Sequence, residues 1–194
     1  MELKIQNEFE VSIDFKTAWS FFSNPEMIVP CIPGAEITRT NDDGSFDGIV
    51  RVKLGAVSLN FTGTMRYESL NESARIMTLT GEGKEKGGAG RAKAIIESAF
   101  SEDNGKTKVS VTTTVNLSGK ILQYGRGMFE QIAKQHFNQF AECARNCLEG
   151  TEKKTPPKPA KLNPFSLIFK AFIAWIVGFV KSIFGKKSDQ SKAS

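Results

Sequence analysis

Residues 119–150 settle the architecture, and they read GKILQYGRGMFEQIAKQHFNQFAECARNCLEG. Wound as a helix, this segment places on one side Leu122, Phe129, Ile132, Ala133, His136, Phe140, Cys143 and Cys147. On the other side fall Glu130, Lys134, Asn138, Glu142 and Arg145. The pattern predicts a long helix that begins after Gly119, continues through Leu148 and ends at Gly150. Its apolar face is suited to cover a sheet.

The residues before this helix indicate strands. Apolar and polar residues alternate over residues 2–14, which predicts a half-buried strand. Asp14 can cap a short helix over residues 16–23, and Pro25 can open a second one around residues 26–29. Runs separated by turn signals predict six more strands, over residues 35–40, 45–54, 57–70, 75–84, 90–101 and 106–117. Residues 1–150 therefore form an α+β domain with an antiparallel meander, and either a packed core or a cavity lies between sheet and helix.

The last 44 residues have a different composition. Residues 151–162 are a Lys/Pro-rich linker, residues 163–185 are predicted to form an amphipathic membrane-anchor helix, and residues 186–194 a disordered basic tail. Lys170 and Lys181 share one face of the helix. The residues expected to enter the membrane are Phe165, Phe169, Phe172, Trp175, Phe179 and Ile183. An in-plane helix is favoured, while a spanning helix and a helix packed on its own domain stay open as alternatives.

The basic charge of the chain belongs to this tail. Residues 151–194 hold nine lysines against two acidic residues, a net charge of +7, and the whole chain is +5, which leaves −2 for residues 1–150. Nucleic-acid binding requires a basic patch on the folded domain. Lysines that flank an apolar helix instead fit an anionic lipid surface. We expect a membrane partner and no nucleic acid.

The sequence gives little support for a secreted protein, a disulfide-stabilised protein, an enzyme or a metal-binding protein. Residues 1–14 lack the apolar stretch of a secretory signal, so we expect a cytoplasmic body. Cys31, Cys143 and Cys147 form neither a CxxC pair nor an even framework, and buried reduced thiols are the expectation. The chain has one histidine and no HExxH or GxSxG motif. We predict that it is not an enzyme and that it holds no metal.

Five short segments, in this order, resemble a known family. They are CIPGAE (residues 31–36), VKLGAV (52–57), FTGTM (61–65), GEGKEKGGAG (81–90) and GKILQYG (119–125). Together they closely resemble the CoxG family of carbon monoxide dehydrogenase subunits, a branch of the START-like (SRPBCC) helix-grip superfamily. The resemblance covers about residues 1–150. It implies a seven-stranded antiparallel sheet curved around a long C-terminal helix, two short helices after the first strand, and an apolar cavity between the layers.

The same resemblance implies a function. Such a protein recruits a molybdenum-containing CO dehydrogenase, or a related hydroxylase, to the cytoplasmic membrane, and its cavity binds and delivers a membrane quinone. The residues expected to line the cavity or to contact the ligand are Tyr67, Leu122, Tyr124, Phe129, Ile132, His136 and Phe140. Two alternatives stay open. One is a recruitment adaptor without a ligand, and the other is an enzyme for a hydrophobic substrate that uses His136, Tyr67 or Tyr124 as acid or base.

The glycine-rich segment over residues 81–90 has two interpretations. A phosphate-binding glycine loop leads from a strand into a helix, whereas residues 90–101 are predicted to continue as a strand. We therefore expect Gly87, Gly88 and Gly90 to give a flexible hairpin at the mouth of the cavity.

Overall fold

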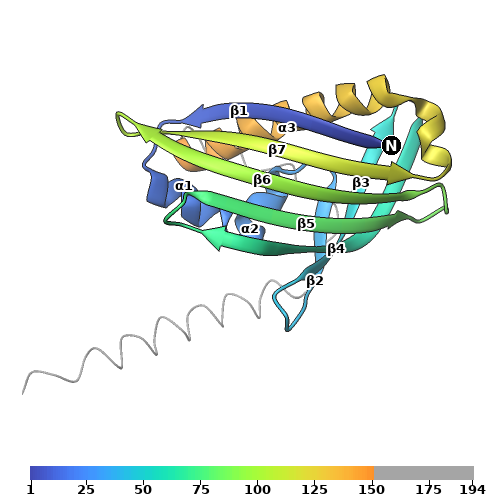
Figure 1. Cartoon of the computed structure of the whole chain (residues 1–194), viewed down its shortest axis with the longest axis horizontal. Coiled ribbons are helices and arrows are strands. Elements are labelled where there is room, and N and C mark those ends of the chain that lie inside the picture. Colours follow the sequence, from blue (N-terminus) through green and yellow to red (C-terminus); the bar gives the residue numbers. More distant parts are fainter. Residues whose placement is uncertain (151–194) are drawn as a thin grey trace, which may run out of the picture. The chain divides into compact units, whose positions relative to one another are not determined.

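Seven antiparallel strands form one sheet that bends around a long helix (Figure 1). The computed structural model describes residues 1–150. Its elements, in chain order, are β1 (Glu2–Val11), α1 (Phe15–Phe22), α2 (Pro25–Ile28), η1 (Val29–Cys31), β2 (Ala35–Thr40), β3 (Phe46–Leu54), β4 (Val57–Asn71), β5 (Ile76–Glu85), β6 (Arg91–Asp103), β7 (Lys106–Ser118), η2 (Lys120–Tyr124) and α3 (Arg126–Glu149). The strand order is β1-β7-β6-β5-β4-β3-β2, so the first strand lies beside the last.

This arrangement confirms the predicted α+β class, the seven strands and the long C-terminal helix. The short helices form where their caps were expected. The Asp14 carboxylate accepts hydrogen bonds from the Thr17 backbone N–H (3.0 Å) and hydroxyl (2.7 Å), which lowers the pKa of Asp14. The predicted linker (151–162), membrane helix (163–185) and basic tail (186–194) lie outside the described residues, as do the membrane-binding side chains named above.

One boundary was predicted wrongly. The helix does not begin after Gly119, because Gly125 adopts a φ of +76° and separates the short 3-10 helix η2 from α3. A left-handed φ of this kind favours glycine and ends helical winding. Residues of η2 therefore do not share the face of α3. At the other end, Gly150 is left-handed (φ +66°) and ends the helix as predicted.

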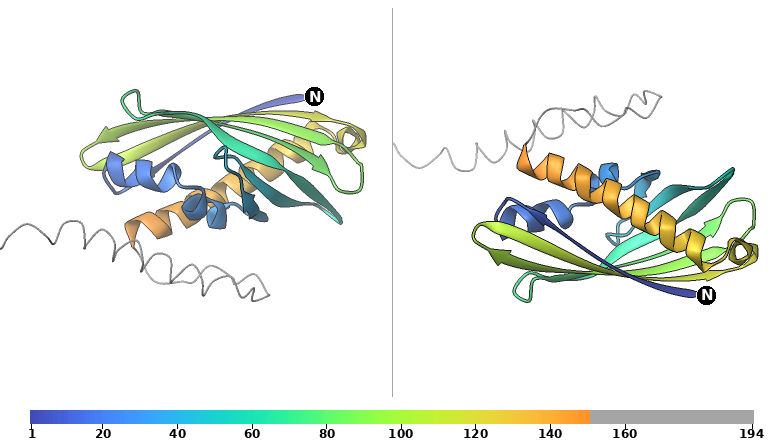
Figure 2. Two further views of the ribbon diagram at one scale, coloured as in Figure 1. Left: turned by 90° about the horizontal axis from the view of Figure 1, so that it is seen from below. Right: turned by 90° about the horizontal axis from the view of Figure 1, so that it is seen from above.

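A row of glycines bends the sheet. Gly48 on β3 pairs with Gly63 on β4, which pairs with Gly83 on β5. A Cβ atom on Gly63 would overlap the Glu82 carbonyl oxygen, so only glycine lets the two backbones approach this closely. Figure 2 shows the result: the sheet curls around α3, and α1 and α2 lie on the same concave side.

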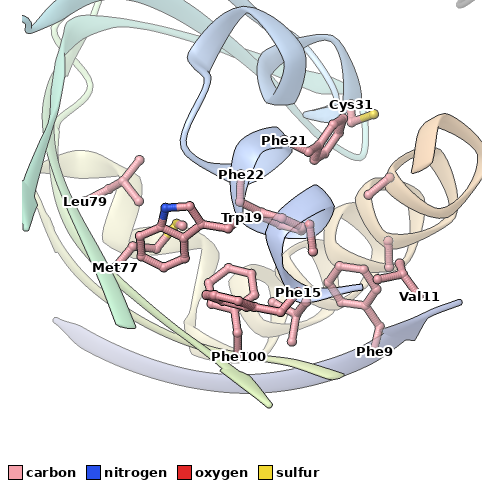
Figure 3. Close-up of a cluster of buried hydrophobic side chains, with 14 residues drawn as sticks. Phe9, Val11, Phe15, Trp19, Phe21, Phe22, Cys31, Met77, Leu79 and Phe100 are labelled. Carbon is pink, nitrogen blue, oxygen red and sulfur yellow. The ribbon is translucent and has the colours of Figure 1, made fainter. Parts of the chain in front are cut away.

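Two separate apolar clusters fill the ends of the layer between sheet and helix. The larger one contains Phe9, Phe15, Trp19, Phe22 and Phe100, which pack around α1 at centroid distances of 5.4–6.1 Å (Figure 3). The smaller one, at the η2 end, consists of Leu3, Leu54, Leu59, Leu117 and Ile121. Residues of both clusters also line the space between sheet and helix that is described below.

Strand β1 stands at an edge of the sheet, and α3 runs along it. The Arg126 guanidinium donates to the Glu2 carbonyl oxygen (2.7 Å) and the Arg145 guanidinium to that of Glu10 (2.9 Å). Near the end of α3, the Glu149 carboxylate accepts from the Ser12 backbone N–H (2.7 Å). The helix is therefore fixed to both ends of the edge strand.

Candidate functional site: a two-chamber apolar cavity

A cavity with two chambers lies between the sheet and α3. The chambers measure about 310 and 340 Å³, and both are lined mostly by apolar side chains. Ile5, Val115, Ala133 and His136 line both of them. These volumes fall within the size range of small-molecule sites, about 300–1,000 Å³.

The two chambers have different walls. The first is closed on one side by Ile28, Val29 and Ile32 of the α2–η1 region, and on the other by Phe137 and Phe140 of α3. The second lies under the bend of the sheet. Its lining residues include Leu59, Phe61, Gly63, Phe129 and Ile132. Gly48, Gly63 and Gly83 thus bend the sheet and also line this chamber at positions where no side chain fills the space.

His136 stands where the chambers meet. It projects from the middle of α3, and its partial burial lowers the pKa of the imidazole. A lowered pKa keeps the ring neutral at pH 7, with one nitrogen as donor and the other as acceptor. None of the hydrogen bonds formed within residues 1–150 engages this ring. The imidazole is thus a half-buried polar group that lines both chambers and forms no hydrogen bond with another group of residues 1–150.

Tyr67 lines the first chamber but is already engaged. Its hydroxyl donates to the Phe22 carbonyl oxygen (2.6 Å) at the end of α1, and burial raises the pKa of Tyr67 to about 12. Its role in the described domain is to tie β4 to α1. The hydroxyl keeps lone pairs that face no other protein partner within residues 1–150.

The sequence that builds this cavity matches a known family. The model of the CoxG family, described as a carbon monoxide dehydrogenase subunit, matches residues 8–149, which is most of the chain. The chain belongs to the CoxG family. A search of curated proteins found no match.

Solved structures show the same fold. A conserved protein from Geobacillus kaustophilus superposes with a TM-score of 0.67 at 17% identity, covering 76% of this chain and 96% of that one. The Zhui aromatase/cyclase from Streptomyces sp. R1128 gives 0.56 at 12% identity, covering 77% and 94%. A START superfamily protein from Mycobacterium smegmatis gives 0.52 at 16% identity, covering 76% and 97%. At these identities the likeness concerns the fold, and it confirms the START-like helix-grip architecture of this CoxG-family chain.

The structure brings together five of the seven predicted ligand residues. Tyr67, Phe129, Ile132, His136 and Phe140 all line a chamber. Leu122 and Tyr124 line neither, because they belong to η2, which Gly125 separates from α3. Leu122 is exposed, and Tyr124 packs against the smaller cluster. Contact with a ligand stays a prediction for every one of these residues.

The glycine-rich segment forms the predicted hairpin between β5 and β6. Gly87, Gly88 and Gly90 follow β5 and line neither chamber. The buried Glu85 carboxylate accepts from the backbone N–H groups of Ala89 (3.1 Å) and Asn60 (3.3 Å), which lowers its pKa. The hairpin is therefore tied to β4 by the Glu85 side chain and by the Lys86 backbone N–H, which donates to the Asn60 carbonyl oxygen (2.8 Å). A role at the mouth of the cavity stays a prediction.

Sequence reasoning missed most of the cavity wall. Phe46, Met65, Met77, Ile96 and Val111 come from five strands and line the first chamber. The turn signals predicted the strands that carry them, but they did not reveal which side chains face a void. The paired glycines of β3, β4 and β5 were the available signal for the bend. They are recognisable as a row only when the register of the strands is known.

The expectation of three reduced thiols is wrong for two of them. Cys31 and Cys143 form a disulfide, with their Cα atoms 5.3 Å apart, and Cys147 is free and exposed. The fold places η1 against α3, which brings together two residues that are 112 positions apart in the sequence. No spacing rule could indicate this pair.

Among the described helices, those of residues 1–150, none has the length and apolar character needed to cross a bilayer.

Proposed function

We propose that this CoxG-family chain is a membrane-tethered accessory protein. It recruits a molybdenum-containing CO dehydrogenase, or a related hydroxylase, to the cytoplasmic face of the membrane, and it carries a membrane quinone in the two-chamber cavity. The family match supports the association with such an enzyme. The single observation that supports a ligand is the neutral, unengaged His136 between two apolar chambers.

A quinone has the chemistry that this cavity could recognise. It combines an apolar isoprenoid tail with a flat head whose carbonyl oxygens accept hydrogen bonds. The chamber walls exclude water from the tail, and the N–H of a neutral imidazole can donate to one carbonyl oxygen. A charged ligand would be disfavoured, because no charged group of residues 1–150 other than Glu82 lines either chamber.

The membrane part of the proposal rests on the sequence beyond residue 150. A basic, aromatic-rich segment tethered by a Pro-rich linker would hold the cavity beside the quinone pool. We propose that this segment lies in the plane of the membrane surface. The association of the chain with anionic vesicles tests this part separately from ligand binding.

Extraction of bound lipid tests the carrier function. Full-length chain is purified from native membranes, extracted with organic solvent and analysed by mass spectrometry. We expect about one quinone per chain, and rebinding of quinone to delipidated chain. His136→Ala should weaken rebinding at least tenfold, the scale of one lost hydrogen bond in an apolar site, about 1.5 kcal/mol. Asn138→Ala is the matched control, because Asn138 is exposed on the same helix.

The same experiment separates the carrier from its main alternative. A cavity that is empty on isolation and stays empty on titration, in a chain that still binds its enzyme partner, identifies a recruitment adaptor. Steady turnover of a hydrophobic substrate that is lost in His136→Ala would instead identify an enzyme.

A further inference from the structure

Three sulfur atoms meet where η1 packs against α3. Cys31 is the last residue of η1 and is buried, while Cys143 and Cys147 lie one helical turn apart on α3. The Cys147 Sγ is 3.8 Å from the Cys31 Sγ, which is already bonded to Cys143. All three sulfur atoms lie within 4.8 Å of one another. A free thiol therefore stands in contact with a disulfide.

We propose that Cys31, Cys143 and Cys147 form a thiol–disulfide exchange centre that fastens the α2–η1 wall of the cavity to α3. The Cys147 thiolate attacks the Cys31 Sγ. A Cys31–Cys147 bond forms, the Cys31–Cys143 bond breaks, and Cys143 leaves as a thiolate that takes up a proton. No electrons enter or leave the chain, so the exchange needs no external oxidant or reductant.

The position of each cysteine suits its part in the exchange. Cys147 is exposed and its Sγ lies 3.8 Å from the Cys31 Sγ, so it is the sulfur placed to attack. Cys31 is buried and joins both alternative bonds, which makes it the common partner. Because Cys143 and Cys147 are four residues apart, the exchange moves the attachment point by about 6 Å along the helix axis.

The centre is coupled to the cavity through η1. Ile28, Val29 and Ile32 precede or follow Cys31 closely and line the first chamber, whose opposite wall is Phe137 and Phe140 of α3. A bond from Cys31 to Cys143 or to Cys147 therefore sets the spacing of these two walls. Regulation of ligand access by this spacing rests on the proposed function, whereas the exchange itself does not.

Disulfide mapping in the full-length chain tests the exchange. The chain is equilibrated with oxidised and reduced glutathione, quenched in acid, alkylated, digested and analysed by mass spectrometry. In the wild type we expect both Cys31–Cys143 and Cys31–Cys147 peptides. Cys147→Ser should retain only the first linkage and Cys143→Ser only the second. The matched control is Cys31→Ser, which removes the common partner and should lose both.

Two results would overturn the proposal. One is a folded Cys143→Ser chain, verified by circular dichroism, in which Cys31 and Cys147 both remain alkylatable after oxidation. The other is one equivalent of zinc retained by the reduced wild-type chain and absent from all three serine variants, because the three sulfur atoms would then be a metal site.

A second measurement addresses the attachment of η1 without any ligand. Amide hydrogen exchange of Ile28 and Ile32, whose N–H groups bond to the Asn24 and Val29 carbonyl oxygens, should accelerate at least tenfold when the wild type is reduced with a phosphine. Cys31→Ser should show the fast rate in both conditions. Equal rates in oxidised and reduced wild type would show that the bond does not hold this wall. Neither result depends on whether a quinone binds.

Discussion

The protonation state of His136 is set by its position between two apolar chambers. Its burial between two apolar chambers favours the uncharged ring and lowers its pKa. On unfolding, the pKa returns to about 6.5 and the unfolded chain binds more protons. A ligand with only hydrogen-bond acceptors could accept from the N–H of this neutral ring.

This shift predicts a pH dependence of stability. Because the folded pKa is the lower one, the contribution of His136 is fully present above about pH 6.5 and is lost as the pH falls below that value. Urea unfolding between pH 5 and pH 8 measures this slope. His136→Gln, which has no titrating group, should flatten it, and an unchanged slope in this variant would assign the pH dependence to other groups.

Tyr67 predicts the opposite dependence at alkaline pH. Burial raises its pKa to about 12, so its contribution is complete below pH 10 and is lost as the pH rises toward 12. Tyr67→Phe removes this loss and also the hydrogen bond to Phe22, at a cost of about 0.5–1.5 kcal/mol in the free energy of unfolding at pH 7. Denaturant titration at pH 7 measures the cost of the lost hydrogen bond, and titration above pH 10 measures the loss of stability through ionisation. A variant as stable as the wild type at pH 7 would show that the bond is not formed in solution.

At the scale of elements, the local patterns predicted most of the fold. Alternation placed the first strand, and the turn signals between runs placed the other six, each to within about three residues. The Asp14 cap and Gly150 marked helix ends for local reasons. The start of α3 was missed because the apolar pattern continues through η2, and only the left-handed Gly125 interrupts it.

The cavity could not be predicted to the same depth. Periodicity marks which side chains face inward, but whether they fill the layer depends on the distance between helix and sheet. That distance is set by the bend at Gly48, Gly63 and Gly83 and by the packing of α1, which are contacts between distant segments. The disulfide was hidden for the same reason. His136 was found because it is the one histidine of the chain, on a face already assigned to the interior.

The bend in the sheet predicts the effect of a small substitution. Gly63→Ala would place a Cβ atom against the Glu82 carbonyl oxygen and force β4 and β5 apart. We expect a loss of about 1–3 kcal/mol in the free energy of unfolding and a weaker binding of any ligand in the second chamber. Gly127→Ala is the matched control, because nothing lies near its Cβ position and alanine favours the helix by about 0.5–1 kcal/mol. Thermal unfolding of the two variants should shift in opposite directions.

Removal of the Glu85 carboxylate should change amide hydrogen exchange locally, in the hairpin between β5 and β6. Glu85→Ala removes the acceptor for the Ala89 and Asn60 amides. The amide of Ala89 should then exchange its hydrogen faster, whereas that of Ile121, which bonds to the Ala89 carbonyl oxygen, reports whether the whole loop detaches. Hydrogen exchange followed by mass spectrometry separates the two results. Unchanged exchange at both positions would show that the loop does not depend on Glu85.

At the scale of the molecule, residues 1–150 contain the cavity, both apolar clusters and the three-cysteine centre. The proposed membrane attachment belongs to residues 163–185 alone. Deletion of residues 163–194 should leave a folded, ligand-competent domain that no longer sediments with anionic vesicles, while the full chain does. Replacement of Phe172 and Trp175 by serine in the full chain is the matched test of the aromatic face. Sedimentation of the truncated chain with vesicles would place the attachment on the folded domain instead.

The two guanidinium groups of α3 that bind β1 affect how copies of this molecule behave at high concentration. An open sheet side normally offers free carbonyl and amide groups on which a foreign segment can align and extend the sheet. Here Arg126 and Arg145 donate to the Glu2 and Glu10 carbonyl oxygens, near the two ends of this edge strand. Between these two points α3 packs along β1. A molecule concentrated on a surface is thereby protected from growing into fibres through its first strand.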